Sequence, residues 1–317
     1  MTPHAVKKRI ILDVDTGHDD ALAIIMAASD KRLELLGITV TAGNQILEKT
    51  LKNTLNVTQA LGLNVPVYSG MHRPLLQDLA TAERIHGESG LDGPVFRPPV
   101  RGAEPLHAVQ YLIDTVMKEP VGSITLVAVG PLTNIAMAVR LCPDFAHRLS
   151  ELIIMGGSMT HGNVTPSAEF NIHADPESAS IVFSSGAPLV MIGLDCTTRV
   201  TLTDALYDRF AGISGPAGYI FSASMAHYIR SCKQYIGESP AMHDPCCVAW
   251  AVNPSIFTWK NHFVAIECRG NYTRGRTIVD QTGVSSEKPN AKVVYAIQPE
   301  PFWEQLEASL RHFSNVS

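Results

Sequence analysis

Short apolar runs alternate with longer amphipathic or apolar segments along the first two thirds of the chain. Runs of strand length lie at residues 10–12, 35–40, 65–68, 123–129, 152–155 and 189–194. Between them, helix-like patterns occupy residues 21–28, 49–61, 132–141 and 176–184. Alternation of this kind favours a mostly parallel sheet with helices on both faces. The pattern therefore predicts an open α/β fold of the Rossmann-like, doubly wound type.

The last third of the chain changes character. Residues 219–234 and 243–252 have helical patterns, and three strand-like segments follow at 262–268, 276–280 and 292–298. An amphipathic helix is predicted at residues 301–313. We find no internal repeat, low-complexity linker or charge run in the sequence. We therefore expect residues 1–317 to form one domain, with extra strands and a helix after the α/β core.

Four aspartates crowd the turn between the first predicted strand and the first predicted helix: Asp13, Asp15, Asp19 and Asp20. Open α/β folds bind ligands at this carboxyl edge of the sheet. Two carboxylates about 4 Å apart repel by roughly 4 kcal/mol at an effective dielectric near 20, so the cluster requires a neutralising partner. Helix capping explains one aspartate well but not four. Ligands that are all oxygen indicate Ca²⁺ or Mg²⁺ rather than zinc.

The composition of the chain excludes some classes of binding partner. The chain has 317 residues, of which 45% are hydrophobic, enough for a large core. With a net charge of −5 and no basic block, neither nucleic acid nor an anionic membrane is expected as a partner. No apolar run reaches membrane-spanning length, and the six cysteines have no framework spacing. These features predict a soluble, cytoplasmic protein.

Further polar groups are expected at the same sheet edge. Asn44 follows the second predicted strand, and the carbonyl of Val129 and the side chain of Met155 end two later ones. The loop after Met155 carries Asn163, Glu169 and Asn171. His243 and Asp244 begin a late helix. Taken alone, Asp244 would be an ordinary helix cap and His243 an ordinary surface or core residue. Their shared position with the aspartates is what makes them candidates.

An ordered set of motifs resembles the nucleoside hydrolases, enzymes that cleave the N-glycosidic bond of ribonucleosides. The stretch Asp13-Val14-Asp15-Thr16-Gly17-His18-Asp19-Asp20 resembles the N-terminal signature of that family, with Thr16 where members usually carry proline. The further matches, in order, are Gly43-Asn44, Ile85-His86-Gly87-Glu88-Ser89-Gly90, Gly130-Pro131-Leu132-Thr133-Asn134-Ile135-Ala136, Met155-Gly156-Gly157, Gly162-Asn163, Ala168-Glu169-Phe170-Asn171 and His243-Asp244-Pro245. Each match is weak alone, but the ordered set is specific.

The resemblance implies a nucleoside hydrolase fold and a role for each matched residue. In the family, Ca²⁺ is held by groups matching Asp15, Asp20, Asp244 and the backbone carbonyl of Val129. Asp15 would also accept a proton from the attacking water, and His243 is a second catalytic candidate. The residues expected to bind the ribose or line its pocket are Asp19, Asn44, Met155, Asn163, Glu169 and Asn171. His86 and Phe170 complete the expected substrate site, and Asp13 would orient the turn.

The sequence indicates the preferred base of the substrate less directly than the metal and ribose sites. Purine-restricted members sandwich the base between tryptophans, but Trp250, Trp259 and Trp303 all fall late in this chain. Residues 90–96 and 165–172 look like bacterial hydrolases that prefer uridine and cytidine, as in pyrimidine salvage. Tyr235, ahead of Tyr228, is the candidate base contact. Arg84 stands where pyrimidine-preferring relatives often carry asparagine, so a purine or broad inosine–uridine specificity stays open. By resemblance, we expect a homotetramer or another homo-oligomer.

Two other function classes fit part of the pattern. Haloacid-dehalogenase-like phosphatases, which use Mg²⁺, also place D-x-D after a strand, with the residue matching Asp13 as nucleophile. Their later lysine motif and acidic pair have no convincing counterpart here. A nucleoside-binding protein without catalysis would share the sugar contacts, but it would not require the complete set of metal ligands and general base. The hydrolase interpretation accounts for more of the motifs.

Overall fold

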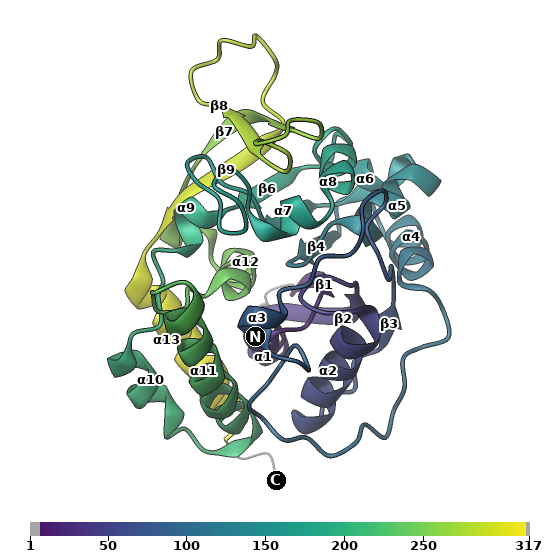
Figure 1. The fold of residues 1–317 in the computed structure, drawn as a ribbon. Helices are drawn as coiled ribbons and strands as arrows, with labels where there is room; N and C mark the ends of the chain where they lie inside the picture. The colour runs from purple at the N-terminus through teal and green to yellow at the C-terminus, as the bar shows by residue number, and fades with distance from the viewer. Residues whose placement is uncertain (1–6, 315–317) are drawn as a thin grey trace, which may run out of the picture.

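A computed structural model describes residues 7–314. At its centre is a nine-stranded sheet with the strand order β3-β2-β1-β4-β5-β6-β9-β7-β8 (Figure 1). The strands are β1 (Lys8–Val14), β2 (Leu33–Val40), β3 (Val67–Ser69), β4 (Ile124–Ala128), β5 (Glu151–Met155), β6 (Leu189–Ile192), β7 (Phe257–Ile266), β8 (Thr277–Asp280) and β9 (Ala291–Ile297). The pairs from β3 across to β9 are parallel, and β7 is antiparallel to both of its neighbours. The predicted open, mostly parallel sheet with added C-terminal strands is confirmed.

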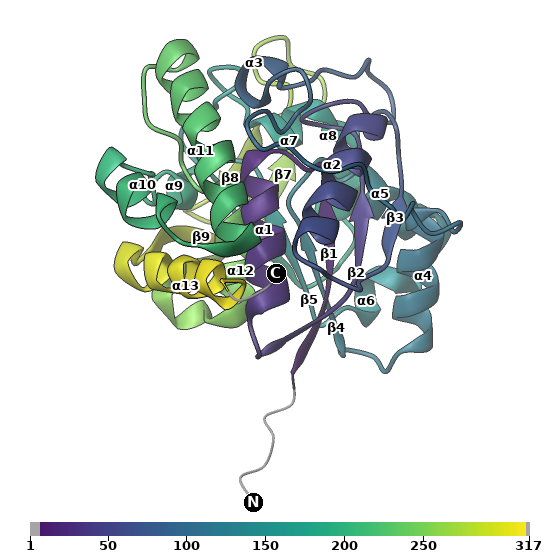
Figure 2. The same ribbon diagram turned by 90° about the horizontal axis from the view of Figure 1, so that it is seen from below.

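Helices cover both faces of the sheet. They are α1 (His18–Ser29), α2 (Leu47–Ala60), α3 (Glu83–His86), α4 (Ala108–Lys118), α5 (Thr133–Leu141), α6 (Asp144–Arg148), α7 (Phe170–Ala174), α8 (Pro176–Phe183), α9 (Leu194–Thr197), α10 (Asp204–Ala211), α11 (Gly215–Tyr235), α12 (His243–Val252) and α13 (Pro299–His312), with a 3₁₀ turn at Pro254–Ile256. Figure 2 shows α1, α12 and α13 on one side of the sheet and α4 and α6 on the other. Two hydrophobic cores result, one on each face.

Helix α1 lies in the interior of the molecule rather than on its surface. It packs against α12, α13 and α11 as well as the sheet, which explains why its sequence is apolar on every side. Helix α12 has the bounds that the sequence predicts, and it crosses against α1. The amino-terminal ends of these two helices therefore meet, which brings Asp244 to the aspartates of the first turn.

Several elements differ from the sequence-based expectation. Strand β9 is inserted between β6 and β7, although it is the last strand in the chain. Strand β7 begins at Phe257 rather than at residue 262, and β3 begins after Pro66, which has no N–H to donate. Helices α4 and α10 and several short helices were not predicted. Among residues 7–314, no helix combines the length and apolar character needed to cross a membrane.

Candidate active site

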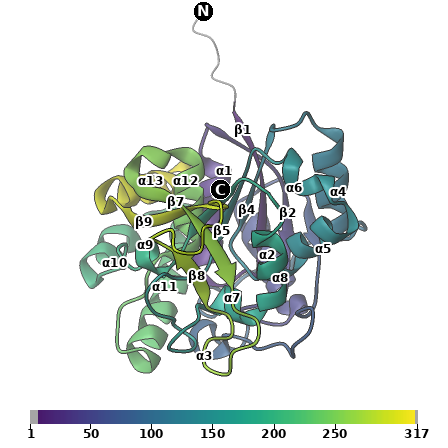
Figure 3. The ribbon, with the colours of Figure 1, turned by 90° about the horizontal axis from the view of Figure 1, so that it is seen from above.

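The candidate site lies at the carboxyl edge of the sheet. Figures 2 and 3 both place α3 and α7 at this edge, away from the beginning of β1. Strand β1 ends at Val14 and α1 begins at His18, so three residues make the connecting turn. A side chain at Gly17 would not fit, because its Cβ would lie 2.5 Å from Nδ1 of His86 and 2.8 Å from Nδ2 of Asn44. The glycine lets the turn, α3 and the loop after β2 approach one another.

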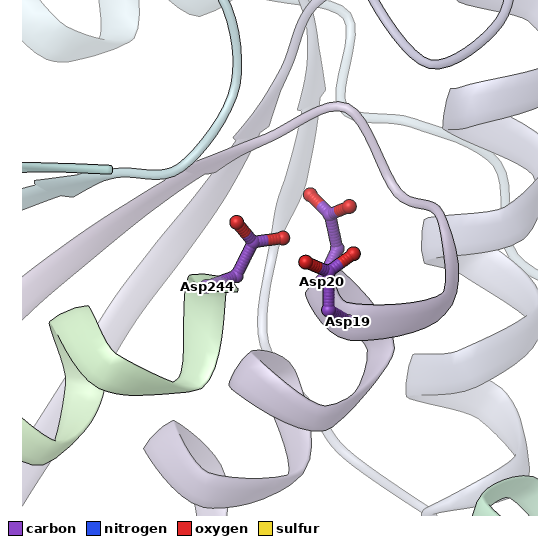
Figure 4. Close-up of side chains that lie close together, drawn as sticks. All are labelled: Asp19, Asp20 and Asp244. Carbon is purple, nitrogen blue, oxygen red and sulfur yellow. The ribbon is translucent and has the colours of Figure 1, made fainter. Parts of the chain in front are cut away.

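Three buried carboxylates converge at the centre of the site. Asp19 and Asp20 from the start of α1 and Asp244 from the start of α12 each offer an oxygen, and these oxygens lie within 4.8 Å of one another. Figure 4 shows the three side chains pointing toward a common space. Two helix amino-termini supply partial positive charge there, but each amounts to only about half a charge. Three carboxylates therefore remain largely uncompensated by the described residues.

Asp20 and Asp15 hold the turn in place through hydrogen bonds. The carboxylate of Asp20 accepts from the backbone N–H groups of Asp15 (3.1 Å) and Gly17 (2.8 Å) and from Nδ2 of Asn44 (3.1 Å). The carboxylate of Asp15 accepts from the backbone N–H of Asn44 at 2.6 Å. Helix capping thus accounts for Asp20 but not for Asp19 or Asp244. The Asp15 carboxylate lies beside the three-carboxylate cluster, and it is not one of its three members.

Electrostatics point to a cation. Burial and repulsion from Asp20 raise the pKa of Asp15 well above its usual range and that of Asp19 to about 7. Burial and the neighbouring carboxylates raise the pKa of Asp244 in the same way. A divalent ion would remove this penalty, and an all-oxygen donor set is the kind that Ca²⁺ and Mg²⁺ prefer. The residues present fit such an ion.

Asp13 lies in β1, just before the turn that leads to the cluster. Its Oδ2 accepts from the hydroxyl of Thr39 (2.5 Å) and from Nδ2 of Asn134 (2.8 Å), which ties β1 to β2 and α5. Its Oδ1 has no hydrogen-bond partner among the described residues. Burial raises the pKa of Asp13 to about 7. Asp13 therefore fixes the end of β1, from which the turn starts, against β2 and α5.

The raised pKa values predict how the metal-free protein responds to pH. A carboxyl group with a higher pKa when folded releases protons on unfolding, so stability falls as pH rises from about 4 to about 7. We expect the metal-free protein to be more stable at about pH 5.5 than at about pH 8, by an amount on the order of a few kcal/mol. Chemical denaturation at both pH values measures the difference. The lowered pKa values of the buried His18 and His243 oppose this change below about pH 6.5, but they act on fewer groups than the raised carboxyl pKa values. A protein no more stable at pH 5.5 than at pH 8 would therefore contradict the uncompensated cluster.

Residues proposed for the sugar form a second group around Asn171. Its Nδ2 donates to the carbonyls of Val129 (2.7 Å), which directly follows β4, and of Met155 (3.1 Å), which ends the adjacent strand β5. Glu169 caps α7, accepting from the N–H groups of Asn171 and Ile172, and burial raises its pKa to about 7. Asn163 is exposed, and its Oδ1 accepts from the N–H of Phe170 at 2.9 Å. The structure thus brings the predicted strand-end residues together.

A cluster of aromatic rings lies next to the aspartates. The ring of His18 lies 5.2 Å from that of His86, and it stacks on Tyr228 at 5.1 Å and on His227 at 5.3 Å, centroid to centroid. No role was predicted for His18, although it lies inside the N-terminal motif, and Tyr228 was a weaker candidate for the base than Tyr235. Tyr235 is 54% exposed at the end of α11, and no ring contact among the described residues joins it to the cluster.

His243 begins α12 beside Asp244. Its Nδ1 lies 2.8 Å from the hydroxyl of Thr197, and burial lowers the pKa of His243 to about 4. Thr197, which ends α9, was not predicted as a site residue. The hydroxyl fixes the imidazole ring, leaving Nε2 as the nitrogen able to face a substrate. His86 and His243 thus approach the site from opposite elements, α3 and α12.

Known proteins resemble this chain over most of its length. Residues 10–304 match the family model described as inosine-uridine preferring nucleoside hydrolase. The pyrimidine-specific ribonucleoside hydrolases RihB of Shigella flexneri and Escherichia coli are 46% identical over 308 residues, covering 97% of this chain and 98% of theirs. These matches extend along almost the whole chain, so they include every motif described above.

Solved structures are similar over the same extent. A purine-preferring ribonucleoside hydrolase from Gardnerella vaginalis matches with a TM-score of 0.92 and 33% identity, covering 98% of this chain and 100% of that one. The plant nucleoside hydrolase PpNRh1 matches with a TM-score of 0.91 and 30% identity, covering 96% and 99%. The resemblance inferred from the motifs is confirmed: the chain belongs to the family of inosine-uridine preferring nucleoside hydrolases.

Proposed function

We propose that this chain is a Ca²⁺-dependent ribonucleoside hydrolase that prefers uridine and cytidine and serves pyrimidine salvage. The observation that carries the proposal is the cluster of buried carboxylates from α1 and α12, placed beside the predicted sugar-binding residues. Asp15, Asp20, Asp244 and the carbonyl of Val129 would hold the ion. Asp19, which clusters with Asp20 and Asp244, then faces the ribose hydroxyls. The ion would supply positive charge that orients the sugar and makes the attacking water more acidic.

The chain's own residues perform the remaining steps. Asp15 accepts the proton of the attacking water as the water oxygen bonds to C1′. Asp19 and Asn171 hold the 2′- and 3′-hydroxyls, while Glu169 and Asn163 hold the 5′-hydroxyl. The departing base takes the electron pair of the C1′–N bond, and His243 or His86 provides its proton. Buried carboxylates suit the positive charge that develops on the ribose as this bond breaks.

Removing the metal should abolish activity. Treatment with EDTA followed by gel filtration is expected to leave no measurable release of ribose and to lower the melting temperature, because the carboxylates lose their neutralising charge. Added Ca²⁺ should restore both properties, and Mg²⁺ should restore less. Metal content is measured alongside activity. Full turnover by protein verified to be metal-free would rule out the proposed site.

The base preference rests on the relatives. The RihB enzymes, named pyrimidine-specific, are 46% identical to this chain, whereas the Gardnerella vaginalis enzyme, named purine-preferring, is 33% identical. The three tryptophans lie outside the described site contacts: Trp250 and Trp303 are buried in α12 and α13, and Trp259 lies in β7. These observations support pyrimidine preference.

A nucleoside panel assayed for released ribose tests this preference. Uridine or cytidine should give a higher kcat/KM than inosine or guanosine. Tyr235→Ala should change the uridine-to-inosine ratio more than the affinity for ribose. Tyr272→Ala, which removes a tyrosine that is 88% exposed between β7 and β8, serves as the control. A purine nucleoside as the best substrate would contradict the proposed preference.

Three further properties belong to the same proposal. We propose one domain, because the described residues share one continuous sheet. We also propose a homotetramer or another homo-oligomer, which sedimentation equilibrium measures. A cytoplasmic location is supported by the six cysteines, all of which are free, as is usual in a reducing compartment.

A further inference from the structure

The loop after β5, residues 156–169, carries Asn163 and Glu169 into the proposed sugar site. It contains no helix or strand of its own before α7 begins. Two other elements hold its first residues, the short helix α9 and the edge strand β8. Both meet the loop at Ser158, which is only 4% exposed. The contacts at Ser158 therefore set the position of the loop, and the proposed function gives them no role.

Asp195 of α9 makes most of these contacts. Its carboxylate accepts from the backbone N–H of Met159 at 2.7 Å, from the hydroxyl of Thr160 at 2.7 Å and from the hydroxyl of Ser158 at 3.2 Å. A carboxylate is a stronger hydrogen-bond acceptor than a neutral group. One half-buried side chain thus holds three consecutive residues of the loop.

The backbones of α9 and the loop are also in direct contact. The N–H of Leu194 donates to the carbonyl of Gly157 at 2.9 Å, and a Cβ at Gly193 would lie only 2.4 Å from the same oxygen. Nε of Arg199 donates to the carbonyl of Tyr295 in β9 at 3.2 Å, which fixes the end of α9 to the sheet. Helix α9 is therefore a rigid support for the loop.

Thr277 of β8 holds the same point of the loop through the backbone. Its hydroxyl accepts from the N–H of Ser158 at 2.8 Å and donates to the carbonyl of Ser158 at 2.6 Å. Thr277 is 2% exposed, so water does not compete for these bonds. Because the side chain of Ser158 is bonded to Asp195 as well, all of the polar groups of Ser158 are fixed.

The tip of the loop is a turn that holds its own shape. The carbonyl of Ala168 accepts from the N–H of Asn163 at 3.1 Å, and the hydroxyl of Thr165 accepts from the N–H of Ala168 at 2.9 Å. The N–H of Phe170 donates to Oδ1 of Asn163, which fixes the orientation of that amide. Nδ2 of Asn163 makes no hydrogen bond within residues 7–314, so it is the atom able to meet a hydroxyl of the substrate.

We propose, on the basis of the proposed function, that Asp195 is a positioning residue for the 5′-hydroxyl of the nucleoside. By fixing residues 158–160 it places Nδ2 of Asn163 where this hydroxyl binds. Asp195 itself does not touch the substrate. Without its carboxylate the turn is free to move away, and the hydroxyl loses Asn163 but keeps Glu169, which the N–H of Gly157 holds separately at 2.9 Å.

Uridine and 5′-deoxyuridine together test the proposal. Asp195→Ala should lower kcat/KM about tenfold for uridine, in the range that one hydrogen bond contributes, but only about twofold or less for 5′-deoxyuridine, which has no 5′-hydroxyl to lose. Asp195→Asn should retain most of the uridine activity, because its oxygen accepts from Met159 and its NH₂ group donates to the hydroxyl of Thr160. Asp208→Ala, at an exposed position on α10, is the control.

A double-mutant cycle asks whether Asp195 acts through Asn163. Asn163→Ala should show the same selective loss on uridine, and adding Asp195→Ala to it should cost little more. Equal losses on the two substrates would instead indicate a general disturbance, for example through Thr197 and His243, and would overturn the inference. Losses that multiply in the double variant would do the same. The proposed function fails separately, if the unmodified enzyme releases no ribose from uridine.

A milder variant keeps the test decisive if Asp195→Ala does not fold. Thr160 is exposed, so Thr160→Val removes one of the three contacts of Asp195 without opening the core. It should lower the uridine-to-5′-deoxyuridine ratio of kcat/KM by about twofold to threefold. Hydrogen exchange should be faster in peptides from residues 158–168 and unchanged in α7. An unchanged substrate ratio would refute the proposal, whatever the exchange shows.

Discussion

Asp15→Asn is expected to lower kcat for uridine by at least about 10²–10⁴-fold, the usual cost of losing a general base. The amide has nearly the same shape, but it cannot take a proton from water and it removes one anionic group. In the structure, Asp15 accepts the backbone N–H of Asn44 at 2.6 Å, a contact that the asparagine oxygen is able to keep. Affinity for ribose should fall much less than kcat, provided that the metal content is unchanged.

Asp13→Asn is the matched comparison. Its amide oxygen would accept from Thr39 and Asn134, and its NH₂ group would replace Oδ1, which has no partner among the described residues. We therefore expect a milder loss than at Asp15. A dead Asp13→Asn together with a nearly normal Asp15→Asn would instead indicate a nucleophile at Asp13. Inversion at the anomeric carbon, without a covalent sugar adduct, is expected for direct attack by water.

Deoxyuridine should be a very poor substrate compared with uridine. The 2′-hydroxyl is proposed to meet Asp19 and the ion in a pocket where Asp19 is only 5% exposed. A substrate without this hydroxyl leaves buried polar groups unpaired, a penalty that reaches about 10⁴-fold in discrimination. Steady-state kcat/KM for the two nucleosides measures the effect.

The comparison is a demanding one, because the glycosidic bond of a 2′-deoxynucleoside is intrinsically the easier one to break. A loss of rate therefore reports binding in the transition state rather than the reactivity of the substrate. 5′-Deoxyuridine, which lacks the 5′-hydroxyl, provides a control. One of the two proposed contacts of that hydroxyl, Asn163, lies on an exposed loop, so its loss should cost less than the loss of the 2′-hydroxyl. Comparable turnover of uridine and deoxyuridine would sink the assignment of Asp19.

The parts of the site that could be predicted from sequence are those that are local in the chain. Asp15, Asp19 and Asp20 share one strand-to-helix turn, and parallel topology places such turns at a single edge. The start of α8 could also be predicted from the sequence, because Asp175 caps the helix and Pro176 follows. Asp244 needed the family motif, because a carboxylate at the start of a helix is otherwise an ordinary cap.

Contacts between segments that are distant in the sequence could not be predicted. His18 meets a ring 68 residues away and a carbonyl 74 residues away, and nothing in its local pattern indicates either contact. Strand β9 pairs with β6 rather than with β8, against the tendency of sequential strands to be neighbours. Helix α4 was missed because His107 caps it, a residue outside the usual set of capping residues.

The meeting of α1 and α12 bears on how the protein is made. Synthesis delivers Asp19 and Asp20 first, yet Asp244 and the helices α11, α12 and α13 that pack on α1 emerge only in the last third of the chain. Until then, the apolar stretch of α1 from Ala21 to Ala28 lacks the three helices that later pack against it. A ribosome-bound chain that stops before α12 would present both an exposed apolar helix and an incomplete carboxylate cluster. Translation that ends early therefore yields a substrate for chaperones or proteases rather than a weaker hydrolase.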